Sequence, residues 1–340
     1  MTRTIFAALL LCATLTAQSA PLYKLTKTVP IGAPERWDLL SFDADSHRVY
    51  VAHGDRITIV DVASGTVVGS IEGFKGGTHG VAVVPALHRG YTDDGEAATA
   101  NSFDVQTLKT LKSIPAADDA DAIVYDKVSG RLFVIDSDPG KITIIDPKTD
   151  TAITTLDGGG KLEIGVADGH GHLYVNGEAK REILRIDTRA LTVDARWPMP
   201  DCESPHGIAV DSRGHHVFAS CANQKMMVLS TQDGTVLASL PIGAHTDGAA
   251  FDPGKRRAFS SNGDGTLTVI GETTPGQFAV LDTVATSIGA RTMTIDPKSG
   301  ELFLVAGDVT ENAGVDPKDF RHRYTVKPGS AKLLVFDPVN

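Results

Sequence analysis

Seven polar residues recur along the chain at a nearly constant spacing and carry the side chains of a potential binding site. They are Asp38, His79, Asp121, Glu163, His206, Asp247 and Arg291, at intervals of 41, 42, 42, 43, 41 and 44 residues. Four carboxylates, two imidazoles and one guanidinium suit a cation, an amine or a polar metabolite that needs both acceptors and a bidentate donor. The same residue types also fasten loops by bonding to backbone N–H groups, so a purely structural role stays open.

Each of these residues lies five positions before the end of a short predicted strand, and each such strand begins a repeat of four. In residues 205–243 the four strands read GIAV, HVFAS, KMMVL and TVLASL, separated by turn residues. One aromatic residue in the second strand marks seven copies, namely Tyr50, Tyr91, Phe133, Tyr174, Phe218, Phe259 and Phe303. The repeats predict one all-β domain, a seven-bladed β-propeller of four-stranded antiparallel blades, because a lone small sheet cannot bury both of its faces.

The second strands also carry a recognisable motif. It reads YVAH at 50–53, YVN at 174–176 and, in degraded form, FSSN at 259–262. In these motifs the chain resembles the YVTN-repeat, YncE-like seven-bladed propellers of bacterial periplasms, over residues 22–340. The resemblance implies the fold, but it implies no particular activity, because one fold hosts many functions.

The N-terminal part of this region is predicted to close the ring. Residues 22–32, LYKLTKTVPIG, parallel the fourth strand of the fifth repeat, TVLASLPIG, and the seventh repeat supplies only three strands of its own. We therefore expect the N-terminal strand to complete the last blade. Such a closure removes two sheet edges that would otherwise be open to pairing with another chain.

Propeller topology indicates which loops share a face. Connections that lead into the first strand of each blade open on the same face as the loops between second and third strands, so the seven polar residues should surround the mouth of the central channel. His53, Asp94, Asp136, Asn176, Cys221 and Asn262 are expected beside them in the second-to-third loops. The seventh such segment, 307–330, is about 20 residues longer than the others and is placed to cover this face. His170, His172, His215 and His216 fall on turns of the opposite face and are predicted to be solvated.

Two main classes of function remain open for the channel mouth, and a third, a subunit of a periplasmic redox enzyme, rests only on fold analogy. The main hypothesis is a binding or scaffolding module for a small polar molecule or a protein partner. The alternative is a metal-assisted hydrolase or lyase acting on a small polar substrate, with His79 or His206 carrying protons. These two histidines lie three blades apart and do not suit one ion, whereas an oxygen-rich Ca²⁺ site among the carboxylates is easier to build. Neither spacing matches a recognised metal motif, so a divalent metal is only a low-priority option, no metal ligand is assigned and the cofactor is unknown.

Residues 1–19 have the layout of a secretory signal peptide. Arg3 precedes an apolar run from Ile5 to Leu15, and small residues follow at Ala17 and Ser19, which predicts cleavage after Ser19. The remaining propeller, 20–340, is expected to be periplasmic or secreted, monomeric and without membrane insertion, because no second apolar segment reaches spanning length. The chain has 32 basic and 42 acidic residues, a formal charge of −10, which excludes a general nucleic-acid binder.

Two cysteines follow the predicted signal peptide. Cys202 precedes the first strand of the fifth repeat and Cys221 follows its second strand, so hairpin pairing brings both to the same face. In an oxidising compartment this arrangement predicts a disulfide. Two buried, unpaired thiols are the alternative.

Overall fold

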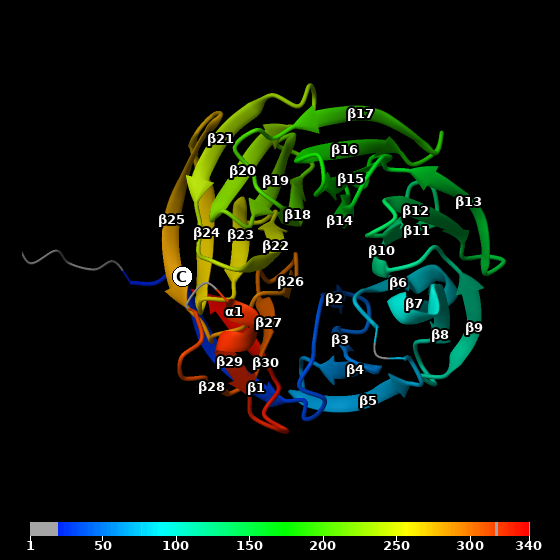
Figure 1. The fold of residues 1–340 in the computed structure, drawn as a ribbon, viewed down its shortest axis with the longest axis horizontal. Helices are drawn as coiled ribbons and strands as arrows, with labels where there is room; N and C mark the ends of the chain where they lie inside the picture. Colours follow the sequence, from blue (N-terminus) through cyan, green and yellow to red (C-terminus); the bar gives the residue numbers. More distant parts are fainter. Residues whose placement is uncertain (1–19, 76, 317–318, 340) are drawn as a thin grey trace, which may run out of the picture.

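The computed structural model describes residues 20–75, 77–316 and 319–339, so the predicted signal peptide lies outside the described residues. Seven four-stranded antiparallel sheets are arranged in a ring, which confirms the predicted propeller (Figure 1). Within the described ranges, no helix is long and apolar enough to cross a membrane.

Six blades are each built from four consecutive strands. Blade 1 contains β2 (Leu40–Asp43), β3 (Arg48–His53), β4 (Arg56–Asp61) and β5 (Thr66–Glu72). Blade 2 contains β6 (Val81–Val84), β7 (Arg89–Asp94), β8 (Thr99–Asp104) and β9 (Thr110–Pro115), with short 3-10 turns η1 (Pro85–Leu87) and η2 (Gly95–Ala97). Blade 3 contains β10 (Ala120–Asp126), β11 (Arg131–Asp136), β12 (Lys141–Asp146) and β13 (Thr151–Asp157).

The next three blades repeat this order. Blade 4 contains β14 (Leu162–Ala167), β15 (His172–Gly177), β16 (Glu182–Asp187) and β17 (Thr192–Pro198). Blade 5 contains β18 (Pro205–Asp211), β19 (His216–Cys221), β20 (Lys225–Ser230) and β21 (Val236–Pro241). Blade 6 contains β22 (Thr246–Asp252), β23 (Arg257–Asn262), β24 (Thr266–Thr274) and β25 (Gln277–Ala285).

Blade 7 joins the two ends of the described chain, as predicted. Its strands, from the channel outward, are β26 (Met293–Ile295), β27 (Leu302–Ala306), β30 (Lys332–Pro338) and β1 (Tyr23–Pro30). Strand β1 pairs antiparallel with β30 along its whole length, from Tyr23 opposite Pro338 to Pro30 opposite Lys332. The Tyr23 ring is buried and packs edge-on against Phe259 of blade 6, with centroids 5.1 Å apart. The closing strand therefore contributes both backbone pairing and core packing.

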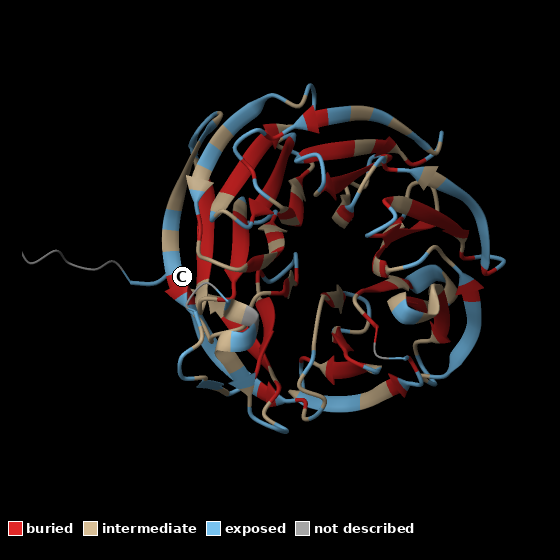
Figure 2. Cartoon of the chain, in the orientation of Figure 1, coloured by how far each residue is buried: buried red, intermediate tan, exposed pale blue. Residues whose placement is uncertain are grey.

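The core lies between blades rather than inside any one of them. All seven aromatic marker residues of the second strands are buried, and Figure 2 shows buried inner strands surrounded by a largely exposed outer strand in each blade. Contacts such as the stacking of Phe42 in blade 1 on Phe303 in blade 7, at 5.4 Å, join neighbouring sheets. Because every blade needs both neighbours to bury its faces, the ring holds the ends of its innermost strands in fixed positions.

The long segment of blade 7 folds as a small unit on the predicted face. It contains β28 (Val309–Glu311), α1 (Phe320–Arg323) and β29 (Tyr324–Val326), and β28 pairs with β29. The Phe320 ring stacks on His245 of blade 6 at 4.2 Å, and the Gly329 N–H donates to the Glu35 carboxylate at 2.6 Å. In Figure 1 this unit lies over blade 7, to one side of the central axis.

Candidate functional site

The seven sequence-predicted residues all lie at the same end of the innermost strands. Four of them are the second residues of their strands, namely Asp121, Glu163, His206 and Asp247. The other three stand two positions before a strand begins, namely Asp38, His79 and Arg291. The structure therefore places them at one channel mouth, and we refer to these seven residues as the polar ring.

Glycines next to the polar ring let the innermost strands approach one another closely. Gly207 follows His206, and a Cβ atom there would lie 2.6 Å from the backbone carbon of Gly248 in the next blade. Gly248 itself follows Asp247, and its Cβ would lie 2.9 Å from the Met293 amide nitrogen. Real side chains do not tolerate such contacts, so these positions require glycine. The close approach brings neighbouring ring side chains within reach of one another.

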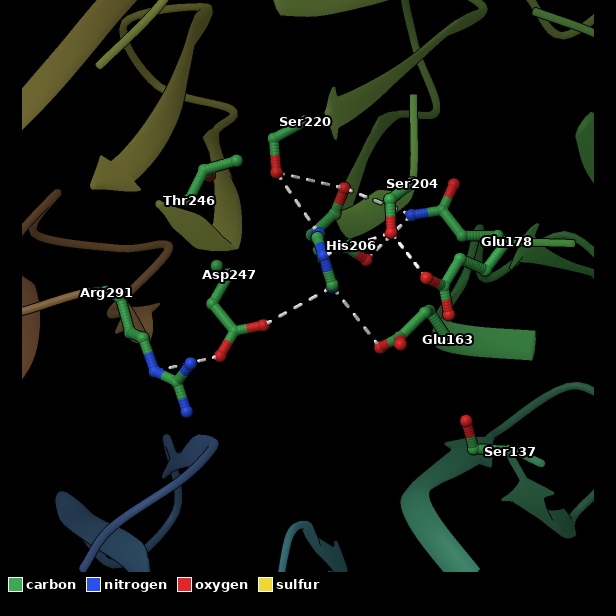
Figure 3. A network of polar contacts seen from close by, with 12 residues as sticks. Ser137, Glu163, Glu178, Ser204, His206, Ser220, Thr246, Asp247 and Arg291 are labelled. Atoms are coloured by element: carbon green, nitrogen blue, oxygen red, sulfur yellow. Dashed lines mark hydrogen bonds and ion pairs between the residues drawn. The ribbon is translucent and has the colours of Figure 1, made fainter. Parts of the chain in front are cut away.

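In one half of the ring, four charged side chains lie next to one another in an unbroken series, which we call the relay (Figure 3). The Arg291 Nε lies 3.2 Å from an oxygen of Asp247, whose other oxygen lies 3.8 Å from His206 Nδ1. On its other side, His206 Nδ1 lies 3.6 Å from Glu163. Burial opposes protonation of His206, but Glu163 and Asp247 outweigh it and raise the pKa of the imidazole. The two carboxylates therefore favour the protonated form of His206.

Three further residues that the sequence did not single out extend this relay. Lys161 Nζ lies 2.9 Å from Glu178 and 3.9 Å from Glu163. The Ser204 hydroxyl donates to Glu178, and its oxygen lies 3.4 Å from His206 Nε2. Both ring nitrogens of His206 thus face oxygen atoms. Lys161 could have been predicted, because it lies two positions before Glu163, immediately before the same strand begins. The repeat spacing gives no signal for Glu178 or Ser204.

The second histidine of the ring is also placed between two carboxylates. His79 Nδ1 lies 3.5 Å from both Asp93 and Asp121. Asp93 is buried, and its two oxygens accept the backbone N–H groups of His79 and Gly80 at 2.6 and 2.7 Å. Burial alone lowers the pKa of His79, but Asp93, Asp121 and Asp38 outweigh it and raise the pKa to about 9. The sequence analysis singled out Asp94 but not Asp93, although the two adjacent carboxylates were a usable signal.

Asp38 differs from the other ring carboxylates. Across the part of the chain that the structure describes, its side chain makes no hydrogen bond and no ion pair within 4.0 Å. Burial raises the pKa of the Asp38 carboxyl well above its ordinary range, nearby Asp247 adds to the rise, and Arg291 opposes it. The ring therefore contains one acceptor whose neighbours do not neutralise it.

Two further ring carboxyls bind protons more tightly than usual. Burial raises the pKa of Asp121 to about 7, against the opposing charge of His79. Burial likewise raises the pKa of Glu163, against the opposing effect of His206. Loss of water around a carboxylate disfavours its charged form, and these shifts identify the mouth as a poorly solvated place for negative charge.

The six residues expected in loops beside the ring are instead strand residues. His53, Asp94, Asp136, Asn176, Cys221 and Asn262 lie within or at the end of second strands and are buried. They bond locally: Asn176 donates to the His206 carbonyl oxygen at 2.7 Å, and His53 Nε2 lies 2.6 Å from the Pro34 carbonyl oxygen. The strands extend further than predicted because ladder pairing outweighs the weak strand propensity of Asn and Asp. These side chains support the ring backbone.

The predicted disulfide is present. Cys202 and Cys221 are joined with their Cα atoms 5.4 Å apart, and both are buried in the core between blades 4 and 5. On the opposite face, His170, His172 and His215 line a cavity of about 270 Å³, where His172 Nδ1 lies 3.2 Å from Asp168. His216 was predicted to be solvated, but it begins β19 and is buried against Phe278. Among residues 20–75, 77–316 and 319–339, no three His, Cys, Asp or Glu side chains are grouped so as to hold a metal ion.

Beyond the polar ring the channel becomes apolar. A cavity of about 320 Å³ is lined by the innermost strands of all seven blades, including Leu39, Val81, Ile123, Val166 and Phe251. The site is therefore a charged mouth above an apolar interior. Such a mouth can bind polar or ionic groups at the ring and leave less polar groups in contact with the channel wall.

The ring of blades and its charged mouth define a seven-bladed β-propeller, and comparisons with known proteins agree. No protein-family model matches the chain. Over 214 residues it is 24% identical to the "Uncharacterized protein YncE" of Salmonella typhimurium and to that of Salmonella typhi, a match that covers 61% of this chain and spans only 57% of the length of each relative. Hydrazine synthase of Kuenenia stuttgartiensis superposes with a TM-score of 0.69 at 15% identity, covering 86% of this chain and 96% of that chain, which shows a shared fold. The chain is a seven-bladed β-propeller that is similar to YncE over part of its length.

Proposed function

We propose that this propeller is an exported binding module, which holds a small polar ligand with a cationic nitrogen at the polar ring. The observation that carries the proposal is Asp38, a carboxyl in the ring without an ion-pair partner among the described residues. A poorly solvated carboxylate is costly unless a cation or a proton neutralises it. A ligand ammonium group next to Asp38 would supply that charge.

The other ring residues support the same class of ligand. Each histidine lies beside two carboxylates, so the two imidazoles are occupied within the ring, while Arg291 has one partner, Asp247, among the described residues. Asp121 is more exposed than the other paired ring carboxylates, and His79 is its one ion-pair partner among the described residues. Negative charge in excess on a rigid circle favours a cationic ligand over an anionic one.

Export is supported by two independent features. The N-terminal sequence has signal-peptide character, and the Cys202–Cys221 disulfide suits an oxidising compartment. A binding module outside the cytoplasm meets small amines and amino acids directly, so the location and the proposed ligand class are consistent.

Thermal-shift measurements on the purified propeller test the proposal. We expect compounds with a cationic nitrogen, from a panel of amines, quaternary ammonium ions, amino acids and dicarboxylates, to raise the melting temperature of the wild-type chain. Asp38→Asn removes the charge at constant size and should abolish the shift. Asp138→Asn is the matched control, because Asp138 lies on the same face with its side chain 75% exposed and outside the ring.

Equal stabilisation of wild type and Asp38→Asn by cationic compounds would contradict the proposal, as would stabilisation by dicarboxylates alone. Elemental analysis of protein purified without added metal gives an independent check. Stoichiometric divalent metal, lost together with the ring carboxylates, would favour the metal-assisted hydrolase or lyase instead.

A further inference from the structure

A second cavity adjoins the polar ring at Arg291. It has a volume of about 260 Å³ and lies between the entry to blade 1, the entry to blade 7 and the long segment of blade 7. Its walls include three aromatic rings, those of Trp37, Phe320 and Tyr324, and the apolar side chains of Ile288, Val309 and Val326. We call this space the aromatic cavity. Its volume suits a single aromatic group rather than a large ligand.

The aromatic walls are fixed in place by contacts outside the cavity. Phe320 stacks on His245 with an interplanar angle of 21° and meets Tyr324 edge-on, with centroids 5.4 Å apart. Trp37 packs so closely against Gly307 that a Cβ at that glycine would lie 3.2 Å from the indole. Rings held in this way can receive a flat group at little cost in side-chain entropy.

Arg291 belongs to both the polar ring and the aromatic cavity. Its Nε lies 3.2 Å from Asp247, its side chain is 42% exposed, and among the described residues its guanidinium makes no hydrogen bond and has Asp247 as its one ion-pair partner. It also lines the aromatic cavity. Trp37 and Asp38 are consecutive, so the indole on the cavity wall and the unpaired ring carboxyl are one residue apart. Asp38 and Arg291 are near enough for each to influence the charge of the other.

We infer that the ligand is an aromatic α-amino acid, with its ring in the aromatic cavity, its carboxylate on the Nη groups of Arg291 and its ammonium group at Asp38. The inference rests on the proposed function and deepens it, since it assigns the ligand class at the same mouth. A guanidinium with two N–H groups directed to one side binds a carboxylate in bidentate fashion. Asp38 and Arg291 carry opposite charges, and they match the ammonium and carboxylate groups that an α-amino acid carries on its α-carbon.

Four probes of stated chemistry test the inference by isothermal titration on the propeller without its signal peptide. They are L-phenylalanine, 3-phenylpropionate without the amine, 2-phenylethylamine without the carboxylate, and L-alanine without the ring. L-Phenylalanine should bind most tightly, and loss of any one group should weaken binding by about tenfold or more.

Variants assign each group to its residue. Phe320→Ala should weaken L-phenylalanine and 2-phenylethylamine by about fivefold each and leave L-alanine unchanged. Arg291→Lys keeps the positive charge but loses the two parallel N–H donors, so it should weaken binding of all three carboxylate probes and leave 2-phenylethylamine unchanged. Leu281→Ala, on the outer strand β25, is the control for a surface substitution far from the mouth. If Phe320→Ala disturbs the segment as a whole, Tyr324→Leu removes only one ring and serves as the second variant.

The outcomes separate this inference from the proposed function. Equal affinities for L-phenylalanine and L-alanine would overturn the aromatic cavity as a ligand site and leave the cationic ligand in place. Binding of 3-phenylpropionate without binding of either amine would overturn the cationic ligand and the amino acid alike, while an effect of Phe320→Ala would still locate the ring. No binding of any probe would overturn the inference, and the amine panel would then decide the proposed function separately.

Discussion

Replacing His79 by Gln removes one positive charge from the polar ring and keeps a side chain that can donate to the Ala120 carbonyl oxygen, 3.3 Å from His79 Nδ1. His79 is only 13% exposed and stands between Asp93 and Asp121. Its pKa rises from an ordinary 6.5 to about 9, which at 1.36 kcal/mol for each unit corresponds to on the order of 3 kcal/mol of stability. The folded protein therefore binds this proton more tightly than the unfolded chain does.

Because the folded protein binds this proton more tightly, the stabilising contribution of His79 decreases as the pH rises. The contribution is fully present below pH 6.5, where the unfolded chain is protonated as well, and it is lost as the pH rises from 6.5 to about 9. Urea denaturation of wild type and His79→Gln at pH 6, 7.5 and 9.5 measures it. We expect His79→Gln to be less stable by about 3 kcal/mol at pH 6 and nearly equal to wild type at pH 9.5.

His170→Gln is the control for this experiment, because His170 is an exposed histidine on the opposite face. It should not change the pH dependence. A difference between wild type and His79→Gln that stays constant within about 0.5 kcal/mol over this range would refute the proposed charge coupling, whatever its absolute size.

Three further predictions concern the scaffold and its processing. The double change Cys202→Ala and Cys221→Ala opens a loop closed by residues 19 positions apart and should lower the free energy of unfolding by about 3 kcal/mol in urea titrations; a loss below about 1 kcal/mol would contradict this. Deleting residues 22–29 exposes β30 and the core around Phe259, so the product should aggregate or melt far below the parent in calorimetry, and an unchanged melting temperature would show that β1 is dispensable. N-terminal sequencing of exported protein should begin at Ala20, and an intact Met1 would contradict signal cleavage.

The fold could be predicted because the residues that indicate it recur at regular intervals along the sequence. One aromatic residue per repeat and one polar residue before each innermost strand recur at the same register, and propeller topology converts equal register into a shared face. The contacts within the face were not predictable in this way. Asp93 reaches His79 across the hairpin of β6 and β7 within blade 2, and Glu178 of blade 4 is linked to His206 of blade 5 through the Ser204 hydroxyl; neither contact is marked by the repeat spacing.

The ends of the strands and the position of the long segment were also not fully predictable from the sequence. Asn176 and Cys221 were expected in loops, yet both pair within the ladder, since backbone hydrogen bonds outweigh local preference at a strand end. The segment 307–330 was correctly assigned to the face of the polar ring. Its position beside Arg291, however, depends on Phe320 meeting His245 in another blade, which is a tertiary contact without a repeat signature.

The pairing of β1 with β30 also determines when the ring of blades can close during folding. Six blades consist of consecutive strands, so strand pairing within each needs only neighbouring parts of the chain, whereas β1 must wait for a strand that is translated some 300 residues later. At about 5–20 residues per second, that delay is roughly 15–60 s. During this time the nascent protein is an open arc, with Tyr23 and the last blade interface uncovered. The closed ring therefore requires both ends of the propeller, and any chain that lacks β30 can form only the open arc.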